Sequence, residues 1–334
     1  MKNGKTTVAD IARQAGVSPA TVSRALNHPE LLKPATLLQV ESAMNALGLT
    51  PEFTTLAPAR QQIIVLNIPE INNSFYQEII RGANTSAQAH GYSLMISVIP
   101  IDRGTIQNFC SLLNRINAAG VILLTWLHEK LLAQINAIAP LIQCCEYNEN
   151  AGYSYVAIDD VAAAESAVEY LITCGHNKIA FINGPNSFAY ARKRKEGFLN
   201  TILKNDLFIP GNWIISLPEI SYEMAYSSAC RLLSSDPCPN AFFVISDTFA
   251  AATVKAAQKY KLRIPRDIMV VGFDNVPLAR MTTPSLTTVN QPAFQQGYSA
   301  CELLFETLNT TEHTVKTLVL GTELIVREST ASKV

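Results

Sequence analysis

The sequence predicts an α/β protein in which a three-helix head precedes a two-lobed body built from doubly wound parallel sheets. Residues 1–50 carry helical apolar spacing with capping signals. Residues 63–292 alternate short apolar runs with amphipathic stretches, which is the rhythm of repeated βαβ units. The chain has 334 residues and 48% hydrophobic content, enough for two or three domains with proper cores.

The first two helices are predicted from their end signals. Thr7 followed by Asp10 resembles a capping box, so a helix is expected to begin near Val8. Gly16 supplies the turn that ends this helix. Pro19 then falls at the first position of a second helix, where its missing N–H costs nothing and its fixed φ is already helical.

The second helix divides into a polar and an apolar face at 100° per residue. The polar face carries Pro19, Ala20, Ser23, Arg24 and Asn27, and the packing face carries Thr21, Val22, Ala25 and Leu26. A third helix is predicted from Pro34 to Leu47, stopped at Gly48, with Leu38, Val40, Met44 and Leu47 as its apolar positions. These three helices form a helix-turn-helix unit whose second helix can enter a major groove.

Charge is compatible with this interpretation of the head. Residues 1–60 hold six lysines and arginines against four acids, whereas the whole chain has a net charge of −1. Base edges are read by short side chains and by one arginine able to fork onto a guanine, while phosphates are held by peripheral groups. The alternative at this point is a small helical packing domain that binds no nucleic acid.

A family resemblance rests on several stretches. "VADIARQAGVSPATVSRALN" followed by "ALGLTP" resembles the head of the LacI/GalR family of bacterial transcription regulators. Downstream, "IPEINNSFYQEIIRGANTSAQAHGY", "GHNKIAFINGP", "RKEGF", "VVGFDN" and "PSLTTVNQP" are similar to the family's later landmarks, in the same order. The resemblance covers nearly the whole chain. It implies a periplasmic-binding-protein-like body whose chain crosses between lobes near residues 160, 290 and 320.

The body is expected to hold nine strands before residue 292, in the stretches "IIVLNIP", "SLMISVIP", "AGVILLTW", "LIQCCEY", "YVAID", "KIAFING", "WIISLP", "AFFVISD" and "IMVVGFDN". The C-terminal "TLVLGTELIVREST" would return to complete both lobes. The domain boundaries that we expect are 1–50 for the head, 51–62 for a linker and 63–334 for the body. Within the body, an N-lobe would take about 63–159 and 293–318, and a C-lobe about 160–290 and 319–330.

Ligands of doubly wound sheets lie beyond the carboxyl ends of the strands. The resemblance implies that Phe75 and Tyr76 stack on a ring, that Arg194 grips hydroxyls and that Asp274 pairs with them. Ordinary packing, a solvated helix charge and an Asx turn are the respective alternatives. Asp247 ends the preceding strand, and three more variable pocket positions are Phe188, Tyr190 and Ile220. An aromatic, partly apolar lining suggests a sugar or a nucleoside.

The resemblance also implies which residues meet DNA. Base contacts are expected from the start of the second helix, and phosphate contacts from the periphery of the head. The expected DNA-binding residues are Thr7, Ser18, Pro19, Ala20, Thr21, Ser23, Arg24, Asn27, Lys33, Thr36 and Leu56. The linker "TPEFTTLAPARQQ" departs from the family, because Pro58 would interrupt a hinge helix and Leu56 is the one plausible minor-groove wedge.

The function predicted on this basis is a sequence-specific repressor, not an enzyme, that binds a pseudo-palindromic operator as a homodimer and is controlled by a small effector. A small-molecule binding protein, or a sugar-processing α/β enzyme with an accessory helical head, is the alternative. No GxGxxG, P-loop or GxSxG motif supports an enzyme. Seven cysteines without ligand spacing predict neither disulfides nor metal, and no cofactor is expected. No signal peptide or spanning segment is evident, which predicts a cytoplasmic protein without membrane contact.

Overall fold

The computed structural model describes residues 7–27, 31–49, 62–310 and 314–331. By its internal contacts the chain divides into two units, Met1–Gln62 and Ile63–Val334, which we call the head and the body. Within the described ranges, no helix combines the length and the apolar character needed to cross a bilayer.

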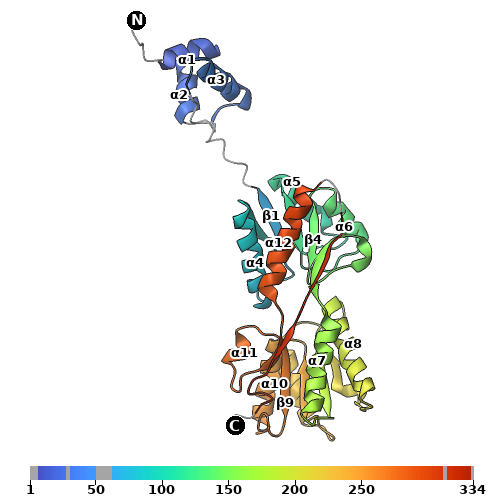
Figure 1. Ribbon diagram of the computed structural model, residues 1–334. Helices are drawn as coiled ribbons and strands as arrows, with labels where there is room; N and C mark the ends of the chain where they lie inside the picture. The colour runs from blue at the N-terminus through green and yellow to red at the C-terminus, as the bar shows by residue number, and fades with distance from the viewer. Residues whose placement is uncertain (1–6, 28–30, 50–61, 311–313, 332–334) are drawn as a thin grey trace. The chain divides into compact units, whose positions relative to one another are not determined.

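The head consists of α1 (Val8–Ala15), α2 (Pro19–Asn27) and α3 (Pro34–Ala46) (Figure 1). The predicted capping box is present, because the Thr7 hydroxyl accepts from the Asp10 backbone and the Asp10 carboxylate accepts from Thr7 N at 3.0 Å. Gly16 closes α1 with φ of 66°, a left-handed conformation that glycine adopts without strain. The end signals thus place the first two helices where the sequence predicts them.

Of the four apolar positions predicted in the third helix, Val40, Met44 and Leu47 pack in the head core and Leu38 does not. The small head core consists of Ile11, Ala12, Val22, Ala25, Val40, Ala43 and Met44, with Leu37 packed against it. Leu38, predicted as a packing position, is 64% exposed, so that prediction is wrong. Leu37, Val40 and Met44 follow the i, i+3, i+7 spacing of one helical face, whereas Leu38 lies about 100° further round.

One half of the body, made mainly of the earlier part of the chain, contains a six-stranded parallel sheet, sheet A. Its strand order is β11-β5-β4-β3-β1-β2. Its strands are β1 (Ile63–Asn67), β2 (Ser93–Ser97), β3 (Gly120–Leu123), β4 (Leu141–Cys144), β5 (Tyr155–Ile158) and β11 (Thr317–Leu320). The helices that cover it are α4 (Phe75–Ala89), α5 (Ile106–Ile116), α6 (Glu129–Asn136) and α12 (Ala293–Asn309), and a 3-10 turn spans Glu149–Ala151. We call this half the N-lobe.

The second half forms sheet B in the order β12-β10-β9-β8-β6-β7, parallel except for the antiparallel strand β12. Its strands are β6 (Ile179–Asn183), β7 (Ile214–Ser216), β8 (Ala241–Val244), β9 (Met269–Asp274), β10 (Thr287–Asn290) and β12 (Glu323–Ile325). Its helices are α7 (Asp160–Thr173), α8 (Ala189–Lys204), α9 (Tyr222–Leu233), α10 (Asp247–Lys259) and α11 (Leu278–Met281), with a 3-10 turn at Gly211–Trp213. We call this half the C-lobe.

The chain passes between the lobes after β5, after β10 and between β11 and β12 (Figure 1). All nine strands expected before residue 292 are present, β10 is a further strand in that range that was not predicted, and the C-terminal segment adds one strand to each sheet. Neither lobe is therefore a continuous segment. The chain leaves each lobe and later returns to complete its sheet, so three crossing segments connect the two lobes covalently.

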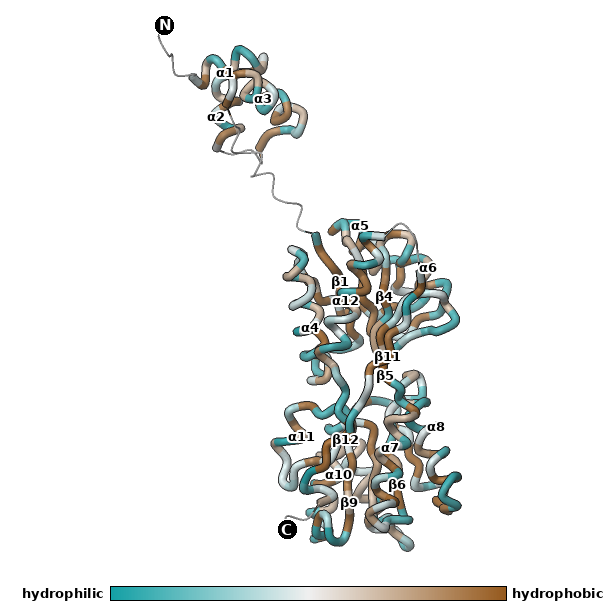
Figure 2. The backbone as a smooth tube through the Cα atoms, in the orientation of Figure 1, coloured by the Kyte–Doolittle hydropathy of each residue, from teal (hydrophilic) through white to brown (hydrophobic). Residues whose placement is uncertain are grey.

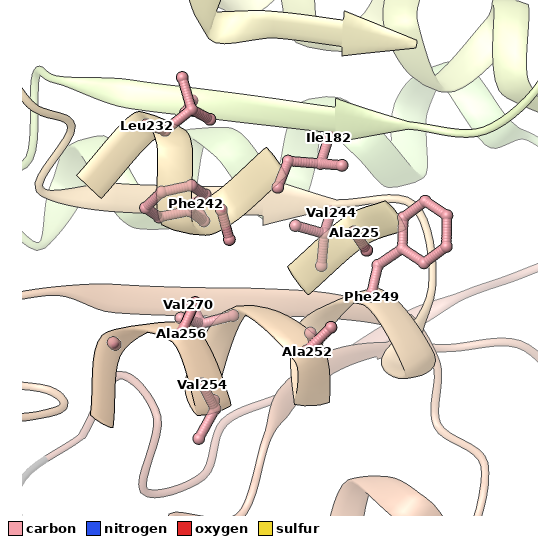
Figure 3. Close-up of a cluster of buried hydrophobic side chains, with 14 of the residues drawn as sticks. Ile182, Ala225, Leu232, Phe242, Val244, Phe249, Ala252, Val254, Ala256 and Val270 are labelled. Atoms are coloured by element: carbon pink, nitrogen blue, oxygen red, sulfur yellow. The ribbon is translucent and has the colours of Figure 1, made fainter. Parts of the chain in front are cut away.

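The inner strands of each sheet are buried on both faces, as parallel sheets with crossover helices require, whereas edge strands such as β11 are partly exposed. In the N-lobe, Ile64 and Leu66 pack towards α4 and α12, whereas Val65 packs towards α5 and α6. In Figure 2 the strands of both lobes run hydrophobic, and the helices around them alternate between hydrophobic and hydrophilic. In the C-lobe, Phe242 and Val244 meet Phe249 and Ala225 of α10 and α9 (Figure 3).

Helices α4 and α12 approach each other unusually closely through two glycines. A Cβ atom at Gly297 of α12 would lie 2.8 Å from the carbonyl carbon of Ile79, and one at Gly82 of α4 would lie 2.9 Å from the backbone nitrogen of Tyr298. Both obstacles are backbone atoms, which cannot swing aside as a flexible side chain can. The two helices lie side by side over sheet A (Figure 1), so this contact sets the position of the segment that enters the N-lobe from β10.

We therefore expect Gly297→Ala to destabilise the body by about 1 to 3 kcal/mol, because the added methyl group forces the two backbones apart. Gly211→Ala is the matched control, since a Cβ there meets no atom within 4 Å. Urea unfolding monitored by circular dichroism measures both. Equal midpoints for Gly297→Ala and wild type would show that the two helices can separate without cost.

Candidate functional site

A cavity lies between the two lobes, beyond the carboxyl ends of the strands. Its empty volume is about 590 Å³, including space that is open to solvent. Loops that follow strands of sheet A form one wall, loops that follow strands of sheet B form the other, and the crossing segments close the back. The lining residues are Asn73, Phe75, Tyr76, Leu124, Cys145, Glu146, Ile158, Asp160, Tyr190, Arg194, Ile220, Ile245, Ser246, Asp274, Gln291 and Gln296.

The guanidinium of Arg194 is the centre of the polar part of the cavity. It is 5% exposed, and its Nε donates to Asp160 Oδ1 at 2.8 Å. Its Nη1 donates to the carbonyl of Ile245 at 2.7 Å and lies 3.6 Å from Asp274 Oδ1. The Phe273 ring lies 3.5 Å from the guanidinium carbon on one side. Arg194 thereby ties α8 to α7 and to the ends of β8 and β9.

The pKa values of the two carboxylates beside Arg194, those of Asp160 and Asp274, are each subject to two opposing effects. Burial raises the pKa of Asp160, and the Arg194 charge and hydrogen bond partly offset this rise. Burial also raises the pKa of Asp274, against the Arg194 charge and a hydrogen bond from Gln291 Nε2 at 2.7 Å. Desolvation is the larger effect in both, as expected for carboxylates removed from water. A ligand hydroxyl that donates to either group would reduce that desolvation penalty.

Glu146 links the N-lobe to the C-lobe at the cavity wall. Its two carboxylate oxygens accept from the backbone nitrogens of Ala189 and Tyr190, at 2.9 and 2.8 Å. These nitrogens belong to the first turn of α8, where free N–H groups and the helix dipole favour an anion. Burial raises the pKa of Glu146, and the two backbone hydrogen bonds act in the opposite direction.

Aromatic side chains supply the apolar part of the lining. The rings of Phe75 and Tyr76, at the start of α4, lie 5.7 Å apart and are tilted by 60°. Tyr190 stacks on Phe188 at 5.2 Å. Burial raises the pKa of both Tyr76 and Tyr190, so their hydroxyls remain protonated and can donate. Ring faces beside hydroxyl and carboxylate groups suit a cyclic ligand with one apolar face and a polar edge.

Six of the eight residues predicted to bind an effector line this cavity: Phe75, Tyr76, Tyr190, Arg194, Ile220 and Asp274. Phe188 and Asp247, which the structure also describes, lie behind the wall. Phe188 precedes α8 and packs against the C-lobe core. Asp247 is fully buried at the start of α10, and its Oδ2 accepts from Val276 N at 2.8 Å.

Glu146, Asp160 and Gln296 line the cavity but were not predicted from the sequence. A signal existed for the first two, because Glu146 follows β4 by two residues and Asp160 follows β5 by two. Carboxylates at the ends of parallel strands could have been collected by that rule. Gln296 lies inside α12, where a polar residue at an apolar helical position gives no indication of the cavity it meets.

In the head, the N-terminal part of α2 presents a surface of short side chains. Ser18, Pro19, Ala20, Ser23 and Arg24 are exposed, and Thr21 is half-buried with its hydroxyl 2.8 Å from that of Ser18. Of the other predicted contacts, Thr7 and Lys33 are exposed and Thr36 is half-buried. The side chain of Asn27, and Leu56 and Pro58 of the linker, lie outside the described residues.

Two family models match the chain. Residues 7–52 match bacterial regulatory proteins of the lacI family, and residues 168–330 match a periplasmic binding protein-like domain. The HTH-type transcriptional repressor CytR of Escherichia coli K12 is 29% identical over 97% of this chain and 96% of its own length. The ribose operon repressor of Halalkalibacterium halodurans is 32% identical, with 97% of both chains covered. The solved complex of the transcriptional regulator CelR with cellobiose has a TM-score of 0.72 and 26% identity, covering 97% of this chain and 100% of that one.

Buried Asp247 predicts a pH-dependent stability. Burial raises its pKa well above the ordinary value, and the nearby Asp274 charge adds to this effect. The folded protein therefore keeps the Asp247 side chain protonated to a higher pH than the unfolded chain does. The contribution of Asp247 to folding stability is thus greatest at low pH and is lost as pH rises through its folded-state pKa. We expect the wild type to lose stability relative to Asp247→Asn between about pH 5 and about pH 8.

Asp267→Asn is the control, because the Arg263 hydrogen bonds lower the pKa of half-buried Asp267 to about 2. Its folded and unfolded pKa values both lie below that range, so the difference from wild type is expected to stay constant. Urea unfolding at the two pH values measures both variants. A constant difference for Asp247→Asn would contradict the burial of an ionisable proton there.

Proposed function

The chain belongs to the lacI family of bacterial regulatory proteins, and we propose that it represses transcription by binding a pseudo-palindromic operator as a homodimer under the control of a small effector. It is a DNA-binding transcriptional regulator and not an enzyme. The periplasmic binding protein-like match covers most of the C-lobe, and the lacI match covers the head. We propose residues 1–50 as the DNA-binding domain, 51–62 as the linker and 63–334 as the effector-binding body.

The α2 surface supports the DNA-binding roles. Short side chains at the N-terminal end of a helix allow its backbone to enter a major groove closely, and Arg24 is long enough to reach a guanine. We propose base contacts for Ser18, Ala20, Ser23 and Arg24, with Pro19 fitting the groove. Thr7, Thr21, Asn27, Lys33 and Thr36 are proposed to contact phosphates, and Leu56 is the candidate wedge.

One observation carries the effector proposal: Phe75, Tyr76, Tyr190, Arg194 and Asp274 come from both lobes and line one cavity. A molecule held by both walls binds best when the lobes are closed, so its binding energy favours one arrangement of the lobes. The names of the relatives include ribose and cellobiose, which are sugars. We therefore propose a sugar or nucleoside effector held by these residues and Ile220, with Phe188 and Asp247 supporting the wall.

An apolar surface at the edge of the N-lobe supports dimer formation. Strand β2 is an edge strand of sheet A, and its Ile96 and the following Val98 are 43% and 47% exposed. Such a patch is unfavourable in water and suits a second copy of the chain. Two heads are also what a pseudo-palindromic operator requires. We place this repressor in the cytoplasm, where its operator DNA lies.

We expect Arg24→Ala to weaken operator binding by about 1 to 3 kcal/mol and to relax preference at one base pair, because a base contact is removed. Lys33→Ala is the matched comparison. Loss of a phosphate contact should weaken binding to all DNA sequences alike and reduce the slope of log affinity against log salt concentration by about one. Selection from a random duplex library, followed by affinity measurements at several salt concentrations, tests both. Unchanged base preference in Arg24→Ala would refute its assignment.

The effector and the operator must be linked through the body. A thermal-shift screen of sugars and nucleosides should find a compound that adds about 2.7 kcal/mol of stability at a hundredfold its dissociation constant. We expect that compound to change operator affinity by about 1 to 3 kcal/mol, near the lower end because of the atypical linker, and Asp274→Asn to remove the change.

The Asp267→Asn variant should respond like the wild type in the same titrated operator-binding assay, because Asp267 does not line the cavity. The direction of the wild-type change tells whether the effector releases the protein from DNA or recruits it. If Asp274→Asn responds as fully as the wild type, the effector does not use this cavity.

A further inference from the structure

The side chain of Gln296 is buried against the cavity with nothing to bind. It is 0% exposed, lies in α12 and lines the cavity wall. Neither its Nε2 nor its Oε1 has a hydrogen-bond partner among the described residues. Its neighbour Gln295, by contrast, donates to Ser299 Oγ at 3.0 Å. Leaving both ends of a buried amide unpaired is costly, so a partner is expected from a molecule in the cavity that Gln296 lines, either water or a ligand that replaces it.

The charges of the lining restrict what that molecule can be. Among the lining residues, all of which are described, Arg194 is the only cation, whereas Glu146, Asp160 and Asp274 are acids. Arg194 is already engaged by Asp160 and by the carbonyl of Ile245, and it lies close to Asp274. A phosphate or carboxylate group would therefore enter a site with an excess of acids and no unengaged cation.

We propose that the cavity takes an uncharged effector and that Gln296 is a specificity-determining residue, whose amide binds a hydrogen-bond donor and an acceptor placed side by side on that molecule. This inference rests on the proposed effector site and deepens it. The amide offers N–H donors and a carbonyl acceptor on one planar group, so it matches a complementary pair on a ligand edge. A site built in this way rejects close analogues that lack the pair.

Two kinds of molecule carry this chemistry. A nucleobase presents an amide-like edge, and a sugar presents neighbouring hydroxyls that each donate and accept. Both have a ring face for Phe75, Tyr76 and Tyr190, and both exist in phosphorylated forms that the acidic lining should exclude. The shared requirement is therefore an uncharged ring with an adjacent donor and acceptor.

The test uses the full-length protein and isothermal titration with matched probes. The uncharged probes are ribose, glucose, cellobiose, uridine, cytidine and adenosine, and the charged ones are ribose 5-phosphate, glucose 6-phosphate and the nucleoside 5′-monophosphates. At least one uncharged probe should bind, and its phosphorylated form should bind at least about tenfold more weakly. Whether the binding probes are sugars or nucleosides distinguishes the two sources.

Gln296→Leu should weaken the binding probe at least about tenfold, because two hydrogen bonds are lost. Gln295→Leu is the matched control on the neighbouring residue, and it should bind like the wild type. For a nucleoside, methylation of the base edge, as in 3-methyluridine, should cost the wild type the same factor and cost Gln296→Leu almost nothing more. For a sugar, deoxy analogues serve the same purpose.

Three results would overturn the inference: a phosphorylated probe that binds more tightly than its uncharged partner, equal affinity in wild type and Gln296→Leu, or no binding by any uncharged probe. If Gln296→Leu does not fold, the comparison of edge-modified and parent probes on the wild type decides the question. Selection of operator DNA from random duplexes is independent of these titrations. Probe binding without any DNA selection would contradict the proposed repressor and leave the inference standing.

Discussion

The body is organised around one buried cation, the guanidinium of Arg194. It joins Asp160 of α7, the end of β8 at Ile245 and the end of β9 at Asp274, and Phe273 covers one face of it. An ion pair this deeply buried is weak evidence for stability, because removing the charges from water costs several kcal/mol per ion. Breaking it by removing one partner is nevertheless severe, about 3 to 5 kcal/mol, because a charge is left without its partner. The C-lobe therefore tolerates this cluster of buried charges only while all its members are present. We interpret the cluster as a binding surface and not as a source of stability.

Most of the fold could be predicted from the sequence, since its signals were local. The capping box at Thr7, the turn at Gly16 and the proline at Pro19 each depend on residues within one helical turn. The strands of the body could be recognised as apolar runs, because a parallel sheet is covered on both faces. Leu38 shows the limit of local patterns: two adjacent leucines near the start of α3 point to different faces of the helix, and only packing against α1 and α2 selects Leu37 for the core.

The cavity was predictable in part, for a reason of topology. Side chains at the ends of strands collect at one edge of a parallel sheet, so Asp274 could be placed without knowing how the lobes close, whereas Tyr190 was placed by the family resemblance. The contacts of Glu146 and Gln296 depend on which elements face each other across the lobes and on the close approach of α4 and α12 at Gly82 and Gly297. No local pattern encodes such long-range contacts. The sequence could therefore suggest the class of site, but not the unpaired amide that restricts its ligand.

The contacts between the lobes explain how occupancy of the cavity can change the conformation of the body. Glu146 of the N-lobe accepts from the first turn of α8, and Lys193 of α8 donates to Tyr147 Oη at 2.6 Å while lying over its ring. Tyr147 is in turn stacked on Tyr155 at 4.0 Å. The contacts of Glu146 and Lys193 join the two lobes and would be lost if the lobes separated, whereas the stack of Tyr147 on Tyr155 lies within the N-lobe. Because Glu146 also lines the cavity, a ligand there and the inter-lobe contacts stabilise the same arrangement, and each must strengthen the other. In a regulator with this geometry the effector site and the inter-lobe contacts share residues, so no further residues are needed to connect effector binding to a change in lobe arrangement.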